Sequence, residues 1–293
     1  MTWRSEQIAW AWDDKPVNVA QTWHGDGPTV LMLPALSSIS TRREMRPLQQ
    51  QLGGAFRTVA IDWPGFGDLP RPKIDWRPET YHAFLKQAAE RIRPAATIAV
   101  GHAAGYALAA AAEAEGTLGA LSLISPTWRG PLPTMAGRRL AAFGSIARAV
   151  DWPVLGALLY RLNVNRPVIG MMARGHVYAD PAWLTPERLR DKLAVTEAPG
   201  ARYASVRFVA GELDAFVQRV DFLAAAARLR TPLQVVYGAQ APRKSKADMV
   251  ALAALDHVDA TELPVGKLSV YEEYPEVVAP VVAAFLRSHL KTG

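Results

Sequence analysis

The sequence contains no cysteine. This absence excludes disulfide bonds, thiolate metal sites and a cysteine nucleophile. No uninterrupted apolar run approaches the roughly 20 residues that a membrane-spanning helix needs, so no transmembrane segment is expected. The first residues, 1–7, show no basic segment followed by an apolar run. No signal peptide is therefore expected, and a cytoplasmic location is the default.

The sequence is also free of charge runs and low-complexity segments. Charged residues make up 20% of its 293 residues and hydrophobic residues 50%, so the chain can bury a full core. The formal net charge of +6 comes mostly from scattered arginines. No nucleic-acid-binding motif accompanies this charge, so no nucleic-acid partner is expected. His176 and His257 have no partner at metal-ligand spacing, and we expect neither a metal nor another cofactor.

Short apolar runs alternate with helical patterns through the first 124 residues. Two segments with alternating apolar and polar residues, Ile8–Trp12 and Val17–Trp23, predict an antiparallel hairpin. Apolar runs predict four buried strands at Thr29–Leu33, Thr58–Asp62, Thr97–Val100 and Leu121–Ile124. Helical patterns follow the first three of these runs, over about 41–52, 79–93 and 106–115.

The alternation stops between about Gly130 and Arg230, where the periodicity is mostly helical and prolines interrupt it. It resumes with a strand at Leu233–Tyr237, and a helix, a weaker strand and a closing helix follow over 246–255, 260–263 and 276–290. Such alternation predicts an α/β fold with a mostly parallel central sheet and helices on both faces. Residues 1–130 and 231–293 would form the core. Residues 131–230 would form a helical insertion over the strand ends, where such sheets bind ligands.

The stretch Thr97–Tyr106 organises the rest of the chain. A strand, the turn Gly101–Gly105 and a helix make the pattern of a nucleophile elbow, which lifts one side chain above a parallel sheet. The two glycines allow strand and helix to approach closely. The residue at the centre of the pattern is Ala103, whose methyl group can neither attack nor lose a proton.

These motifs, in this order, resemble the α/β-hydrolase superfamily over nearly the whole chain. Leu33–Leu36 stands where that family keeps its oxyanion loop, and Asp62–Gly67 matches its D-x-x-G-x-G turn. Gly101–Gly105 matches the elbow, and the insertion at 131–230 looks like the family's helical cap. The resemblance implies an α/β-hydrolase fold. Hydrolases of this family carry a triad in the order nucleophile, acid, histidine.

The triad that the resemblance implies is absent from this sequence. Ala103 occupies the nucleophile position, and Ala241 occupies the acid position in Gly238–Pro242. The histidine position falls on Lys267, or on Leu268 if the segment is one residue longer. Three independent losses indicate a natural absence rather than a single engineered substitution. Serine hydrolysis by the usual mechanism is therefore not expected.

Backbone and polar groups near the elbow remain candidates for a site. The main-chain N–H groups of Ala104 and of Ala35 or Leu36 are expected to converge as an oxyanion hole, unless that geometry survives only as scaffold. His102 and Lys267 are candidate acid–base groups. The alternatives are that His102 packs beneath the loops and that Lys267 extends to solvent.

Several further side chains have both a functional and a structural interpretation. Ser37 and Ser38 either face the pocket or cap the helix that begins near Thr41. Glu272 and Glu273 are expected as surface charges. Three aromatic residues just beyond strand ends are candidates for the pocket wall or are ordinary core: Trp63, Tyr106 and Trp128.

Two functions from different classes follow. In the first, the protein is non-hydrolytic and binds a hydrophobic small molecule between core and cap, as a carrier, sensor or accessory subunit, with a protein partner left open. In the second, an enzyme of hydrolase ancestry uses the oxyanion hole with an acid–base group outside the triad, for lyase, isomerase or cofactor-free chemistry. The first is favoured because no acid–base pair survives in the sequence.

Overall fold

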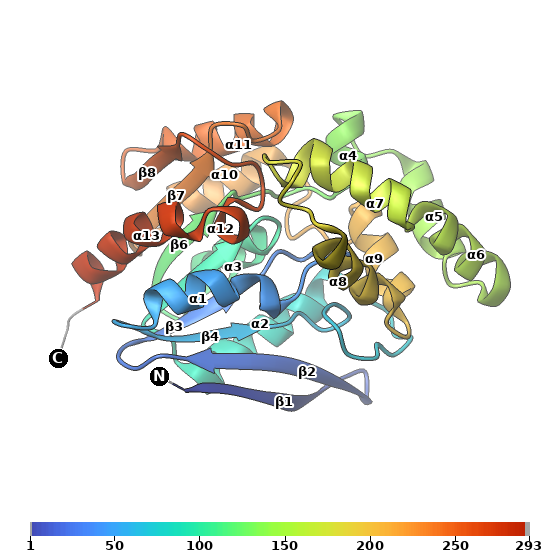
Figure 1. Ribbon diagram of the computed structural model, residues 1–293, viewed down its shortest axis with the longest axis horizontal. Helices are drawn as coiled ribbons and strands as arrows, with labels where there is room; N and C mark the ends of the chain where they lie inside the picture. The colour runs from blue at the N-terminus through green and yellow to red at the C-terminus, as the bar shows by residue number, and fades with distance from the viewer. Residues whose placement is uncertain (1, 291–293) are drawn as a thin grey trace.

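The computed structural model describes residues 2–290 and has one eight-stranded sheet at its centre (Figure 1). The strands are β1 (Trp3–Trp12), β2 (Lys15–His24), β3 (Thr29–Leu33), β4 (Arg57–Ile61), β5 (Ala96–Val100), β6 (Ala120–Ile124), β7 (Leu233–Gly238) and β8 (Val258–Leu263). Their order across the sheet is β1-β2-β4-β3-β5-β6-β7-β8. The pairs β1–β2 and β2–β4 are antiparallel, and the other neighbouring pairs are parallel. The predicted α/β fold with a mostly parallel sheet is confirmed.

The hairpin β1–β2 adds an antiparallel edge to the sheet. Asp13 and Asp14 at its tip have φ of 48° and 57°, the left-handed conformation that a tight two-residue hairpin turn requires. Trp12 pairs with Lys15 directly across this turn. The two strands are longer than the predicted 8–12 and 17–23. Backbone pairing between them continues beyond the residues that show the alternating apolar pattern.

Helices cover both faces of the sheet (Figure 1). On one face, α1 (Arg46–Leu52) and α13 (Pro275–His289) pack against each other and over an apolar cluster that includes Met32. On the other face, α2 (Pro78–Ile92), α3 (Ala103–Glu113) and α11 (Arg243–Ala253) pack over a cluster that includes Leu31. Leu31 and Met32 belong to different clusters because successive side chains of a strand point to opposite faces.

Every element between β6 and β7 is a helix, and we call this set the helical insertion. It comprises α4 (Pro131–Ala136), α5 (Ala141–Ala149), α6 (Pro153–Asn163), α7 (Arg166–Met172), the π-helical turn η2 (Ala173–Val177), α8 (Pro186–Glu197), α9 (Ala201–Ala210) and α10 (Arg219–Ala227). The helices α4, α6, α7 and α8 carry proline at their first or second position. Four of the prolines that interrupt the periodicity therefore start helices, where the missing N–H costs no hydrogen bond.

Within residues 2–290, no single helix is both long and apolar enough to cross a bilayer. The helices α5 and α6 reach that length and composition only as a pair, and they meet at a bend of 103°.

Candidate functional site

The connection between β5 and α3 is the centre of the expected site, and it is two residues long. Gly101 has a left-handed φ of 54°, and His102 has a helical φ of −67° at the N-cap of α3. A Cβ built on Gly101 would come within 4 Å of one atom outside its immediate neighbours, the Cβ of Ala35 at 3.3 Å. The turn therefore has its left-handed residue at Gly101, which presents no side chain.

Ala103, expected at the centre of the turn, lies in the first turn of α3. The side chains of Ala103, Ala104 and Leu36 are fully buried. The N–H of Ala104 donates to the carbonyl oxygen of Gly101 at 3.1 Å, so this expected oxyanion donor is already used inside the turn. The helix begins three residues before the predicted start at 106, because alanines have the strongest helix propensity.

The loops after β7 and β8 carry the positions where the family resemblance places the acid and the histidine. Ala241 is buried in the apolar cluster that also contains Ala103. The Lys267 Nζ donates to the carbonyl oxygen of Arg174 in η2 at 2.7 Å. Leu268 packs against the cluster of Ala103 and Ala241 instead. Lys267 therefore ties this loop to the helical insertion, and Leu268 contributes an apolar side chain to the cluster.

The two serines after β3 do not cap the following helix. The capping residue is Thr41, whose hydroxyl accepts the N–H of Arg43 at 3.1 Å at the start of η1 (Arg42–Met45). The Ser37 hydroxyl accepts the N–H of Ile39 at 3.5 Å within its own turn. Among the described residues, the Ser38 hydroxyl has no hydrogen-bond partner.

The three aromatic candidates for the pocket wall are buried core residues. The polar atom of each side chain also donates a hydrogen bond to a distant part of the chain, which fixes the position of the ring. Trp63 Nε1 donates to the Pro34 carbonyl at 2.9 Å, and Tyr106 OH donates to the Leu213 carbonyl at 2.8 Å. Trp128 Nε1 donates to the Asp248 carboxylate at 2.8 Å. Burial raises the pKa of Tyr106 well above its usual range.

His102 has a buried carboxylate partner that the sequence analysis missed. Its Nε2 lies 2.8 Å from Oδ1 of Asp214, and both side chains are buried. The same carboxylate accepts the N–H of Gly130 at 2.8 Å and pairs with Arg139 at 2.5 Å. The His102 Nδ1 is buried without a hydrogen-bond partner in residues 2–290. Asp214 follows α9 and is separated from His102 by 112 positions, so no local motif links them.

Helix α9 and the loop after it cover the elbow and this His–Asp pair. The Phe208 ring packs edge-on against His102 with ring centroids 5.3 Å apart. Ala204 lies so close to Gly65 that a Cβ added to Gly65 would be 2.9 Å from the methyl group of Ala204. Ala103, Ala204 and Phe208 belong to one apolar cluster. Side chains of the insertion therefore fill the space above the elbow.

A cluster of ionisable side chains joins α8 to the core. The Lys192 Nζ pairs with Glu44 and, at 3.1 Å, with Glu272. Tyr271 donates its hydroxyl to Glu44 at 2.7 Å, and Tyr178 donates to Glu272 at 2.8 Å. Burial raises the pKa of Glu272 to about 7. Burial opposes the charge of Lys192, but the two carboxylates outweigh it and raise the pKa of this lysine.

The expectation that Glu272 and Glu273 are surface charges is wrong. They lie in α12 (Val270–Glu273), whose other two residues are buried in the core. Glu272 is largely buried in its pairing with Lys192, and Glu273 is buried. The Glu273 carboxylate accepts the N–H groups of Ala179 at 2.9 Å and Asp180 at 2.6 Å. Both carboxylates therefore hold the insertion on the core.

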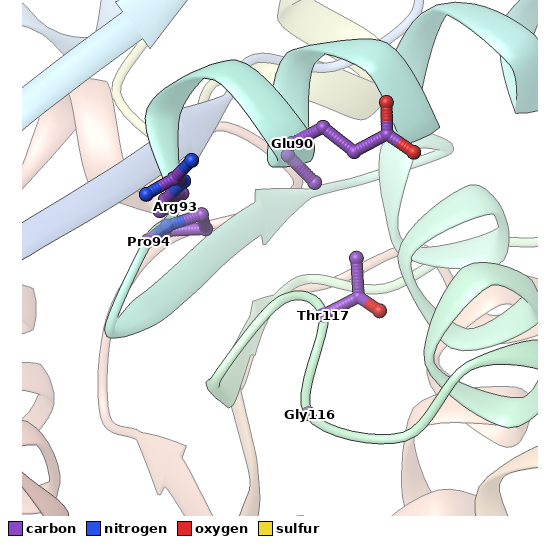
Figure 2. Close-up of a pocket in the computed structure, with 6 residues that line it drawn as sticks. Glu90, Arg93, Pro94, Gly116 and Thr117 are labelled. Carbon is purple, nitrogen blue, oxygen red and sulfur yellow. The ribbon is translucent and has the colours of Figure 1, made fainter.

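Two of the hollows on the surface lie away from the elbow. One, of 620 Å³, lies beside η1 and α8, and most of its lining residues are charged. The other lies between the end of α2 and the loop before β6, around Arg93 and Thr117 (Figure 2). It is at the amino ends of the strands, whereas such sheets bind ligands at the carboxyl ends. Within residues 2–290, no three His, Cys, Asp or Glu side chains are grouped to hold a metal ion.

The sequence identifies the family to which this fold belongs. The model of the alpha/beta hydrolase family matches residues 23–281, and the chain therefore belongs to that family. No curated protein matches the sequence.

Solved structures with this fold cover nearly the whole chain. A thermophilic esterase from Thermogutta terrifontis is 17% identical with a TM-score of 0.75, over 98% of this chain and 100% of that one. A hydrolase from Pseudomonas aeruginosa PA01 is 18% identical with a TM-score of 0.72, over 96% and 98%. A haloalkane dehalogenase from Agrobacterium tumefaciens C58 is 15% identical with a TM-score of 0.71, over 98% and 97%. Identities this low show a shared fold alone.

Proposed function

We propose that this protein is a non-hydrolytic member of the α/β-hydrolase family that acts by binding rather than by covalent catalysis. The observation that carries the proposal is the elbow, where the turn presents Gly101 and the next candidate, Ala103, is fully buried. Ala241 and Leu268 add no ionisable group from the neighbouring loops. Without a hydroxyl, thiol or carboxylate at the turn, no acyl-enzyme or alkyl-enzyme can form there.

The proposed ligand is a hydrophobic small molecule held between the carboxyl edge of the sheet and the helical insertion. The side chains that meet there, among them Phe66, Ala103 and Phe208, belong to one apolar cluster. A ligand enters this space only when Phe208 leaves its contact with His102. The filled cluster then corresponds to the ligand-free, closed form, and binding exchanges protein–protein contacts for protein–ligand contacts.

Native mass spectrometry of the purified protein, with the neutral dye Nile red as an added probe, tests this function. Phe208→Ala removes the side chain that fills the space and should tighten Nile red binding about tenfold, because cavity creation leaves apolar surface for the dye. Phe143→Ala, in α5 and outside the cluster, is the matched control and should leave the affinity unchanged. Absence of both a copurifying molecule and dye binding to Phe208→Ala would contradict a ligand site here.

The pair His102–Asp214 supports a second candidate, an enzyme without the triad. A buried carboxylate fixes the tautomer and orientation of an imidazole, and with Nε2–H bonded to Asp214 the Nδ1 lone pair is free to take a proton. Access again requires displacement of Phe208. His102→Gln and Asp214→Asn distinguish the two functions. An enzyme would lose turnover of a lyase or isomerase substrate in both variants, whereas a binding protein keeps its ligand in both.

A further inference from the structure

Helices α5 and α6 carry exposed apolar side chains at one end of the molecule, where they project away from the sheet (Figure 1). Among the side chains that the structure describes, thirteen large hydrophobic residues are exposed, and nine of these lie between Met135 and Met171. A gathering of this kind marks an interaction surface rather than scattered surface residues. We call it the α5–α6 surface, and its central residues are Ile146, Trp152, Val154, Leu155, Leu158 and Leu162.

The exposed residues of α6 follow the geometry of one helix face. Val154, Leu155, Leu158 and Leu162 have the i, i+1, i+4, i+8 spacing of an apolar stripe. In an ordinary surface helix such a stripe faces the core, but Val154 is 82% exposed and Leu162 61% exposed. The stripe therefore has no partner within the chain that the structure describes.

The segment that carries this surface is also strongly basic. Residues 131–180 contain six arginines, two aspartates and no lysine or glutamate, so they supply +4 of the formal net charge of +6. Asp151 is paired with Arg207 outside the segment, at 2.7 Å. One arginine, Arg139, pairs with Asp214. The others pair with no carboxylate in residues 2–290: Arg138, Arg148, Arg161, Arg166 and Arg174.

We propose that the α5–α6 surface docks on a lipid bilayer with anionic headgroups. The apolar face of α6 would enter the boundary between headgroups and acyl chains, with Trp152 at the interface and the unpaired arginines against lipid phosphates. With 11 residues, α6 is too short to cross a bilayer and lies on its surface. A second copy of the chain fits less well, because a symmetric contact would bring two surfaces of charge +4 together. The proposal is independent of the chemistry at the elbow.

Because the chain has no cysteine, a single label reports on one position. The variant Leu158→Cys carries an NBD fluorophore and is mixed with vesicles of phosphatidylcholine containing roughly 30% phosphatidylglycerol. The fluorescence should rise at least about twofold as the label enters the apolar layer, and the rise should fall away as sodium chloride screens the arginines. Val250→Cys in α11, 47% exposed beside 53% for Leu158, is the matched control and should not respond.

Vesicle sedimentation of unlabelled protein tests the same surface by substitution. Leu155→Asp with Leu158→Asp should lower the bound fraction about tenfold. Val217→Asp with Val220→Asp, two exposed apolar residues outside the surface, should leave it unchanged. Thermal unfolding checks that all variants are folded. No binding at low salt, equal binding to pure phosphatidylcholine, or a label signal that rises with protein concentration without vesicles would overturn the proposal, and the last result would assign the surface to a second copy.

Discussion

At the scale of single residues, Gly67 shows how one position fixes the loop after β4. The buried carboxylate of Asp62 accepts the Arg42 N–H at 2.5 Å and its guanidinium at 2.6 Å. A Cβ on Gly67 would lie 2.5 Å from Oδ2 of the same carboxylate. Burial raises the pKa of Asp62 to about 6, and Arg42 limits the rise. The second glycine of the D-x-x-G-x-G turn is therefore needed for the approach of the aspartate.

Gly67→Ala and Gly116→Ala form a matched pair, because both residues have a φ of 83° and a Cβ on Gly116 would meet nothing within 4 Å. Gly116→Ala should lower the free energy of unfolding by about 1 kcal/mol through backbone strain alone. Gly67→Ala should lower it by about 3 kcal/mol, because the methyl group also displaces Asp62. Urea unfolding measures both. Equal losses would show that contact with Asp62 is unimportant.

The pH dependence of stability tests the cluster around Glu272. Its folded pKa, about 7, lies above its ordinary value of 4.5. The folded protein holds this proton more tightly than the unfolded chain, so the stabilisation is fully present below about pH 4.5 and is lost as the pH rises through about 7. Glu272→Gln removes this titration. The pKa of Asp62 is also raised, but Asp62 is present in both Glu272→Gln and the unmodified protein. The difference in pH dependence between these two proteins therefore reports on Glu272 alone.

We expect the free energy of unfolding to fall less between about pH 5 and pH 8 in Glu272→Gln than in the unmodified protein. Glu187→Gln, an exposed position in the same helix as Lys192, is the control and should keep the original slope. Urea titrations at the two pH values provide the measurement. A steeper fall in Glu272→Gln would mean that the carboxylate is stabilised, not destabilised, in its ionised form.

At the scale of elements, the strands were the most predictable part of the chain. The strand β3 coincides with its predicted range, and β6 and β7 differ by one residue at one end. Uniformly apolar runs give this signal because strands in the middle of a parallel sheet are buried on both faces. The predicted start of α3 was wrong by three residues, because Ala103 and Ala104 show no apolar–polar periodicity that would mark the beginning of a helix.

The candidate site was predictable in position but not in detail. The spacing of Gly101 and Gly105 located the elbow, but it could not show which of the five residues adopts a left-handed φ. The partnership of His102 and Asp214 joins residues 112 positions apart, which no local pattern encodes. The burial of Glu272 and Glu273 likewise depends on tertiary contacts, of Glu272 with Lys192 in α8 and of Glu273 with the loop at Ala179.

Restoration of a triad tests the geometry of the elbow. Two triple variants are compared, and both carry Ala241→Asp and Leu268→His. The nucleophile is introduced by Gly101→Ser in the first set of substitutions and by Ala103→Ser in the second. The first set should hydrolyse p-nitrophenyl acetate above background, because the Cβ at position 101 would meet only Ala35. The second should stay silent, because position 103 is fully buried. Activity in the second set alone would mean that Ala103, not Gly101, is the presented residue.

At the scale of the whole molecule, buried polar contacts fix the helical insertion to the core. The guanidinium of the buried Arg71 donates to the carbonyl oxygens of Gly67, of Val195 at 2.9 Å and of Ala201 at 3.5 Å. It therefore joins the loop after β4 to α8 and α9. Burial lowers the pKa of Arg71, which indicates that the charge is held there at a cost that these carbonyls offset.

Arg71→Ala should free α8 and α9 while leaving the sheet intact. Limited proteolysis should then cut the helical insertion at least about tenfold faster, because cleavage follows the population of the locally open form. Arg57→Ala, an exposed arginine at the start of β4, is the control. Identical digestion of the two variants would show that the insertion is held without Arg71.

Intact mass spectrometry after incubation with a fluorophosphonate most directly tests the proposal that this protein does not use covalent catalysis. The reagent adds stoichiometrically to an activated serine and scarcely to ordinary hydroxyl groups, whose protons no base removes. With Gly101 at the turn and Ala103 buried behind it, the mass of the protein should remain unchanged. One added phosphonyl group per chain, at Ser37, Ser38 or any other serine, would contradict the account and identify this protein as a hydrolase with an unrecognised nucleophile.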